Sequence, residues 1–291
     1  MGTTHIIDGK QTAADFRKNL AEEIKRAGIS PGLAVILVGD NPASLIYAKN
    51  KQKAAQEVGV TVEVHHLAAL SSERMVMDLI DALNKRPDIH GILLQLPVPM
   101  HLNPQNLIER IDPVKDVDGL HPANVGKMTS GLPAMIPCTP LGCMYLIKQV
   151  VPSLVGKQAV VVGRSALVGR PLAHLLLQED CTVTQAHSKT THLAEVCRQA
   201  DILVAAAGVP HLIGADAVKK GAVVIDVGIN RQENGKITGD VDFDALQDIA
   251  SFITPVPGGV GPMTIAMLLF NTLKAARNQM KTGLDMMLYG E

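Results

Sequence analysis

Aromatic side chains are scarce in this chain, and their scarcity excludes some kinds of function. They make up 2% of its 291 residues, as four Phe and three Tyr with no Trp. Surfaces on which nucleic-acid bases stack need several such side chains close together. The formal net charge of −1 also provides no basic footprint for a polyanion or an acidic membrane. We therefore expect neither nucleic acid nor membrane as a partner.

Clustered cysteines and long apolar runs are lacking as well. Cys138, Cys143, Cys181 and Cys197 form no Cys-x-x-Cys pair and no metal-ligand spacing with a histidine. Unclustered cysteines in a chain of this length are typical of a reducing compartment. No apolar run approaches the ~20 residues of a membrane span, and the first residues do not follow a signal-peptide pattern. These absences favour a cytoplasmic protein without a metal site.

The apolar residues that are present, 47% with Ala and Tyr included, alternate between strand-like and helix-like patterns. This alternation predicts an α/β chain with parallel sheets. In the first half, strands are expected at residues 33–38, 60–67 and 89–96, and helices at 12–27, 43–58 and 71–85, the last capped by Ser71. A loop-rich stretch with eight prolines is expected at 97–140, followed by a connecting helix at 141–149.

A second alternation of strand-like and helix-like segments begins at Gln158 and predicts a second α/β domain. Strands are expected at 159–163, 181–187, 201–208 and 222–228, and helices at 171–178, 193–200 and about 262–281.

Residues 255–264 read PVPGGVGPMT, with three prolines and three glycines. Proline fixes φ, whereas glycine permits positive φ and close approach to the backbone. Pro262 suits the first turn of a helix. We interpret the segment as a shaped backbone surface at a helix start that can form a ligand wall; a rigid turn is the alternative.

The segment VVVGRSALVGRP, residues 160–171, passes from a strand through Gly163 into a helix, as in a dinucleotide-binding turn. It lacks the full G-x-G-x-x-G pattern, so an ordinary βα loop is the alternative. The next strand ends without the carboxylate that binds the ribose of NAD and is followed by Ser188, while Arg164 lies in the first loop; a solvated loop with a helix cap is the alternative for residues 187–190. Because Arg and Ser can bind a 2′-phosphate, the pattern indicates NADP.

Three polar segments in the first half could carry chemistry. Tyr47 and Lys51 are four residues apart on a predicted helix, so they share a face, and a partly desolvated lysine can transfer protons near neutral pH. Gln95 ends an apolar strand, where parallel sheets place ligands. In KDVDG, Asp118 could bind an amino-substituted heterocycle, whereas Asp116 reads as a turn or cap residue. For each position, a purely structural role is the alternative.

Together these segments resemble the bifunctional methylenetetrahydrofolate dehydrogenase/methenyltetrahydrofolate cyclohydrolase family, over essentially the whole chain. The most specific segments are Tyr47-x-x-x-Lys51, GILLQLPVP, KDVDG, VVVGRS and PGGVGPMT. The resemblance implies a three-layer α/β folate-binding domain at 1–140, which the C-terminal helix 265–291 rejoins. It also implies a Rossmann-type NADP-binding domain at 141–264.

The resemblance implies two reactions in one-carbon metabolism. Hydride passes from 5,10-methylenetetrahydrofolate to NADP, and water then opens the methenyl product to 10-formyltetrahydrofolate. The implied catalytic and substrate residues are Lys51 for proton transfer, Gln95 as its hydrogen-bond partner, Tyr47 packing on the folate, Asp118 holding the pterin, and Gly261 and Thr264 on the wall. The implied cofactor contacts are Gly163, Arg164, Ser165, Ser188 and Ile229.

Some members of this family are dehydrogenases only, and others prefer NAD. The intact Lys51 and Gln95 favour the bifunctional form, and Arg164 with Ser188 favours NADP. A homodimer is expected by analogy. A simple dehydrogenase of a small metabolite would leave Tyr47, Lys51 and Asp118 unexplained in a separate domain, and a non-catalytic sensor would not need Lys51. The tail at 282–291 is assigned no role.

Overall fold

The computed structural model describes residues 3–232 and 235–280, which form two compact α/β units. The three-stranded unit comprises Phe16–Gly126 and the described residues from Leu268 on. The six-stranded unit comprises the described residues up to Asp15 and Lys127–Met267. Both sheets that define the units are parallel, so the predicted fold class is confirmed.

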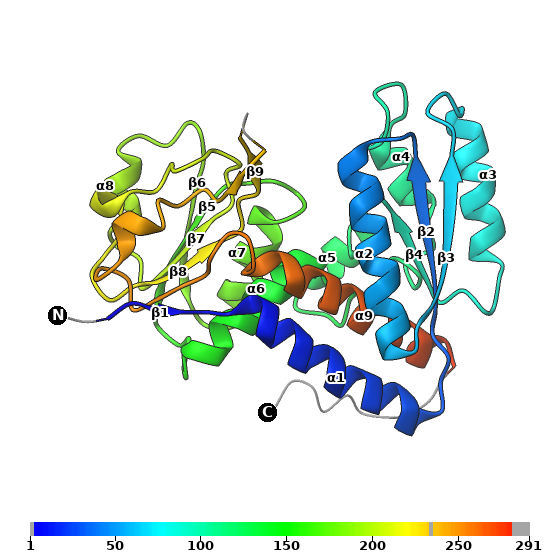
Figure 1. Ribbon diagram of the computed structural model, residues 1–291, viewed down its shortest axis with the longest axis horizontal. Helices are drawn as coiled ribbons and strands as arrows, with labels where there is room; N and C mark the ends of the chain where they lie inside the picture. The colour runs from blue at the N-terminus through cyan, green and yellow to red at the C-terminus, as the bar shows by residue number, and fades with distance from the viewer. Residues whose placement is uncertain (1–2, 233–234, 281–291) are drawn as a thin grey trace. The chain divides into compact units, whose positions relative to one another are not determined.

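The three-stranded unit has the strand order β3–β2–β4, and all seven residues of the central strand are buried. This burial on both faces explains the uninterrupted apolar run at its centre. One face packs against α3 and α4 through a core that includes Ile36, Ile80 and Leu107, while α2 lies on the other face (Figure 1). The bounds are β2 Gly32–Val38, β3 Thr61–Leu67, β4 Gly91–Leu94, α2 Pro42–Val58, α3 Glu73–Asn84 and α4 Pro104–Arg110.

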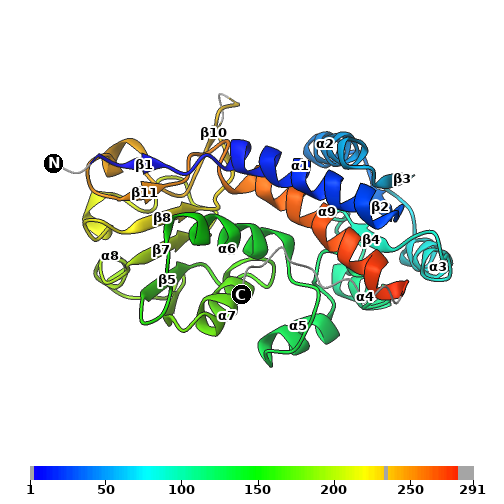
Figure 2. The ribbon, with the colours of Figure 1, turned by 90° about the horizontal axis from the view of Figure 1, so that it is seen from below.

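The end of the chain returns to this unit, as predicted. Helices α1 (Gly9–Ala27) and α9 (Val260–Gln279) run side by side (Figures 1 and 2). Their contact includes the rings of Phe16 and Phe270, whose centroids are 6.0 Å apart. A partly buried ion pair joins Glu23 of α1 to Arg277 of α9.

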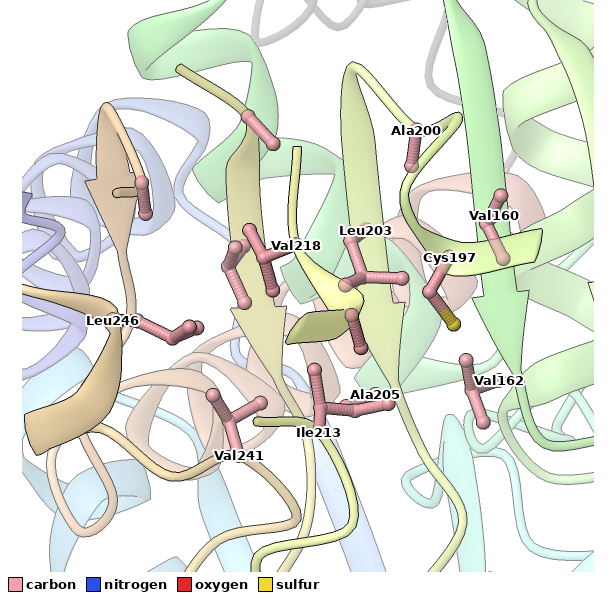
Figure 3. Packing of buried hydrophobic residues seen from close by; sticks show 14 of the residues in the cluster. Val160, Val162, Cys197, Ala200, Leu203, Ala205, Ile213, Val218, Val241 and Leu246 are labelled. Carbon is pink, nitrogen blue, oxygen red and sulfur yellow. The ribbon is translucent and has the colours of Figure 1, made fainter. Parts of the chain in front are cut away.

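The six-stranded unit has the strand order β1–β11–β8–β7–β5–β6. Helix α8 packs on one face, and α6 and α7 lie on the other (Figure 1). The core beneath α8 joins Val160, Leu203 and Ala205 of the strands to Cys197 and Ile213 (Figure 3). The bounds are β1 His5–Ile6, β5 Gln158–Val162, β6 Thr182–Ala186, β7 Ile202–Ala205, β8 Val223–Asp226, β11 Phe252–Ile253, α6 Cys138–Val150, α7 Gly169–Gln178 and α8 Leu193–Cys197.

The boundary between the units differs from the one expected at residue 140. Strand β1 pairs with β11, which groups the start of the chain with the six-stranded unit. Residues 127–140 also belong to that unit. A two-residue strand has no periodicity to reveal it, and its partner lies almost at the other end of the chain.

The stretch expected to be rich in loops, 97–140, also contains two short helices that the sequence did not predict. They are α4 and α5 (Pro122–Thr129), and a proline opens each. Proline density suggested a loop, but proline at the first position of a helix is a start signal. The cap of α3 is Ser72, not Ser71, because Ser72 Oγ accepts a 3.3 Å hydrogen bond from Met75 N. Of the expected helix 265–291, residues 281–291 lie outside the described residues.

Candidate functional site

A lysine and a glutamine from separate elements meet in the three-stranded unit. Lys51 Nζ donates a 2.8 Å hydrogen bond to Gln95 Oε1. Gln95 follows β4, and its backbone N donates to Ile36 O of β2 at 2.9 Å, so the residue continues the sheet. Its amide Nε2 donates to Leu96 O at 2.8 Å. This second bond sets the orientation of the amide, so that its oxygen faces the ammonium group.

Helix α2 presents Tyr47 and Lys51 together. The two residues are separated by one helical turn, so their side chains lie on one face. Tyr47 is 39% exposed and Lys51 is half-buried, whereas Lys49 and Lys53 are exposed. The arrangement provides a partly desolvated cation with an oriented hydrogen-bond acceptor and an accessible phenol beside it.

In the KDVDG segment, Lys115 and Asp116 have structural roles, whereas the Asp118 carboxylate is more accessible. Lys115 Nζ donates to Leu83 O at 3.2 Å and Arg86 O at 2.7 Å, which caps the end of α3. Burial lowers the pKa of this lysine. Asp116 accepts bonds from Leu120 N, His121 N and Asn124 Nδ2, which agrees with the predicted turn role.

Asp118 is half-buried on the same turn. The preceding Val117 is fully buried, and its carbonyl accepts a 2.9 Å bond from Asn271 Nδ2 of α9. A Cβ on Gly91 of β4 would lie 2.5 Å from Val117 Cγ1, so the strand needs glycine there. The turn that carries Asp118 is therefore held from two sides within this unit.

In the six-stranded unit, the candidate cofactor residues follow the carboxyl ends of neighbouring strands. Gly163, Arg164 and Ser165 follow β5, and Ser188 follows β6. The register pairs Val162 with Ala186, so Arg164 and Ser188 stand two residues beyond the same pair. Arg164, Ser165 and Ser188 are exposed, as is Ile229 after β8. Carboxyl ends of parallel strands are where dinucleotides bind in such sheets.

The turn from β5 into α7 has the close backbone packing that is typical of a dinucleotide-binding turn. Gly163 has φ +124°, and a Cβ there would lie 2.1 Å from Ala206 O. A Cβ on Gly169 would lie 2.2 Å from Gly163 O. The strand end and the helix start therefore pack backbone against backbone, as the glycines of such turns require. Ser165 Oγ accepts from Val168 N at 3.1 Å, which stabilises the start of α7.

The PVPGGVGPMT segment uses its three glycines differently. Gly258 has φ +106°, which favours glycine. A Cβ on Gly259 would lie 2.5 Å from Pro255 O. A Cβ on Gly261, in the first turn of α9, would meet no described atom within 4 Å. Thr264 Oγ1 lies 3.0 Å from Thr139 Oγ1. The bend thus requires Gly258 and Gly259, whereas the described residues leave open space at Gly261.

Family comparisons match both units. The residues 7–118 match the model of the tetrahydrofolate dehydrogenase/cyclohydrolase catalytic domain, and 137–280 match that of its NAD(P)-binding domain. The chain belongs to the tetrahydrofolate dehydrogenase/cyclohydrolase family. The predictions of this family and of a nicotinamide-nucleotide cofactor are confirmed.

Several relatives in this family are similar over nearly their whole length. Bifunctional protein FolD of Geobacillus thermodenitrificans is 55% identical, with 94% of this chain and 98% of that protein covered. The solved structure of the bifunctional FolD dehydrogenase/cyclohydrolase from Campylobacter jejuni has a TM-score of 0.92 at 49% identity, covering 94% of this chain and 99% of that one. The Trypanosoma brucei enzyme, solved with NADP and an inhibitor, has a TM-score of 0.91 at 38% identity, covering 97% and 100%.

Two buried carboxylates of the NAD(P)-binding domain were missed from the sequence. Asp226 is 3% exposed and Asp240 is fully buried. Burial raises the pKa of Asp226 to about 6, against the opposing effect of its backbone hydrogen bonds. A carboxylate ending the apolar strand VVID was the available signal, because buried acids need hydrogen-bond donors around them.

Other candidate features lie apart from these residues. A cavity of about 450 Å³, lined in part by Lys157 and Asp201, opens at the amino ends of β5 and β7, the opposite edge of the sheet from Arg164. All four cysteines are buried. In the described part of the chain, no helix is long and apolar enough to cross a membrane. Nor do three or more His, Cys, Asp or Glu residues in 3–232 and 235–280 gather into a metal-binding group.

Proposed function

We propose that this chain oxidises 5,10-methylenetetrahydrofolate with NADP and then hydrolyses the methenyl product to 10-formyltetrahydrofolate. Family membership over both units supports the pair of reactions. The hydrolysis of the methenyl product is supported most directly by the 2.8 Å hydrogen bond between Lys51 and Gln95. A dehydrogenase alone would have no need of an oriented lysine in the catalytic domain.

For the dehydrogenase step, the chain's task is to bind and orient. When bound, NADP supplies the hydride acceptor. Gly163 and Ser165 would lie against its phosphates at the start of α7. Ile229, which follows β8, would contact another part of the cofactor. Arg164 and Ser188 would bind the 2′-phosphate, which separates NADP from NAD. The folate nitrogens stabilise the resulting cation, so the step demands no strong base.

For the cyclohydrolase step, the chain must move a proton. Water adds to the methenyl carbon; Lys51 Nζ, acting as the neutral amine, takes a proton from the adding water and then gives it to the leaving ring nitrogen. Gln95 orients the ammonium or amine through Oε1. Tyr47 packs on the folate, and Asp118 accepts hydrogen bonds from the amino-substituted pterin. Gly261 and Thr264, in the first turns of α9, are further substrate-binding residues in this proposal.

We infer further that the protein acts in the cytoplasm as a homodimer. The unclustered, buried cysteines and the family support this setting. Sedimentation at micromolar concentration tests the dimer directly, and a single monomeric species would contradict it.

A two-stage spectroscopic assay tests the function. Methylenetetrahydrofolate is supplied with NADP or NAD, and reduced cofactor is followed together with the methenyl product. We expect faster turnover with NADP, followed by enzyme-dependent decay of the methenyl signal. Persistence of that signal at its uncatalysed rate would instead indicate a dehydrogenase-only member of the family.

A further inference from the structure

Asp240 holds a segment of backbone at the carboxyl edge of the six-stranded sheet. Its Oδ2 accepts from Ala207 N at 2.6 Å and Gly208 N at 2.8 Å, and its Oδ1 accepts from Val209 N at 3.0 Å. These three consecutive amides follow the end of β7. Oδ1 also accepts from Asn230 Nδ2 at 2.8 Å, next to Ile229. One carboxylate therefore ties the segment after β7 to the segment after β8.

Asp226 continues this network in the other direction. Its carboxylate accepts from Asp240 N and Gly228 N at 2.9 Å and from Val241 N at 3.0 Å. Its own backbone N donates to Thr254 Oγ1 at 2.7 Å. Thr254 directly precedes the PVPGGVGPMT segment. The network thus reaches a third segment, the one that follows β11.

The surrounding glycines are fitted to the two carboxylates. A Cβ on Gly228 would lie 2.2 Å from Asp240 Oδ1, and one on Gly239 would lie 1.8 Å from Asp226 Oδ2. Neither glycine has a positive φ in the structure, so conformation alone does not require glycine at either position. Their small size lets the backbone close around the acids.

We propose that Asp240 is a positioning residue for the dinucleotide, acting through the backbone segments after β7 and β8. The inference rests on the proposed function, because it assumes that the cofactor lies at this sheet edge. A carboxylate with four donors fixes its partners more tightly than neutral bonds would. Hydride transfer needs donor and acceptor held in near-attack geometry, and an error of about 1 Å costs on the order of 100-fold in rate.

The test is Asp240→Asn in the full-length protein. An amide offers one acceptor oxygen where the carboxylate offers two, so some of the four donors must lose their partner. We expect the KM for NADP to rise on the order of tenfold and the dehydrogenase kcat to fall. Hydrolysis of supplied methenyltetrahydrofolate, which needs no NADP, should stay within about twofold of wild type. Asp244→Asn, an exposed acid nearby, is the matched control.

A second variant covers the case in which Asp240→Asn does not fold. Asn230→Ala removes a single donor to Oδ1 and should raise the KM for NADP in the same direction but less. An equal loss of both activities in the variants, or no change in either, would overturn the inference. Direct titration with NADP distinguishes a failure of this inference from a failure of the proposed function. If wild type binds NADP but oxidises no methylenetetrahydrofolate, the proposed function fails, whereas weakened NADP binding by Asp240→Asn still supports the positioning role.

Discussion

Lys51 Nζ and Gln95 Oε1 are 2.8 Å apart, although 44 residues separate them in the sequence. The helix supplies the cation, and the end of the neighbouring strand supplies the acceptor. Since the glutamine amide is itself held by Leu96 O, the lysine meets an acceptor whose orientation is already set. Such preorganisation is what a proton-transfer group needs.

Replacing this lysine should separate the two activities. We expect Lys51→Met to lower methenyltetrahydrofolate hydrolysis at least ~100-fold, because positioned acid–base groups contribute about 10²–10⁴-fold. Dehydrogenase turnover should fall much less. Lys53→Met, on the same helix but exposed, is the control and should hydrolyse normally. Full retention of hydrolysis by Lys51→Met would remove the proposed role.

Arg164 should determine the choice of cofactor. We expect Arg164→Ala to raise the KM for NADP about ten- to 100-fold while changing that for NAD only slightly, because a charge-assisted bond to the 2′-phosphate is lost. Steady-state kinetics with each cofactor measure this. Lys157→Ala removes an exposed cation at the opposite end of β5 and should leave both constants unchanged. Equal losses for NADP and NAD would contradict the 2′-phosphate assignment.

Two glycines of the PVPGGVGPMT segment should respond in opposite ways to alanine. Gly259→Ala places a methyl group 2.5 Å from Pro255 O, so we expect it to destabilise the fold by about 1–3 kcal/mol. Gly261→Ala enters open space in a helix and should be neutral or stabilising by up to about 1 kcal/mol.

If Gly261 faces the ligands, its alanine variant should be stable yet have raised KM values. Thermal unfolding and kinetics on both variants provide the comparison. A stable Gly261→Ala enzyme with wild-type constants would show that this glycine does not approach a ligand.

The pKa of Asp226 predicts a pH-dependent contribution to stability. Its folded pKa, about 6, lies above the ordinary value of 3.8 for an aspartate. The folded state therefore holds the proton more tightly, and the stabilisation from the protonated acid is lost as pH rises from about 4 through 6. Asp240 is the neighbouring acid that adds to the rise in pKa.

Urea unfolding of wild type and Asp226→Asn at pH 4 and pH 7 isolates this contribution. The wild-type advantage over the variant should shrink by on the order of 2–3 kcal/mol between the two pH values. A constant difference, or one that grows with pH, would refute the raised pKa.

Local patterns in the sequence were enough for most of the architecture. The apolar runs around Val35 and Val161 marked strands buried on both faces, because a parallel strand between helix layers has no polar side. The Tyr47–Lys51 spacing placed both residues on one helix face, since the α-helical repeat is local. Short elements such as β1 and α4 were missed, because two to seven residues carry little periodicity.

Contacts between residues that are distant in the sequence could be learned only from the tertiary structure. Nothing in the sequence near Asp240 indicates that its carboxylate binds the backbone after β7, because that contact depends on which loops the sheet order brings together. The same holds for Gly259 and Gly261, because the sequence alone does not distinguish these two glycines. Only the folded backbone shows which one would collide with Pro255 O and which one faces open space. The sequence determined which groups are present and which elements carry them, whereas packing and burial determined which groups meet and how each is constrained.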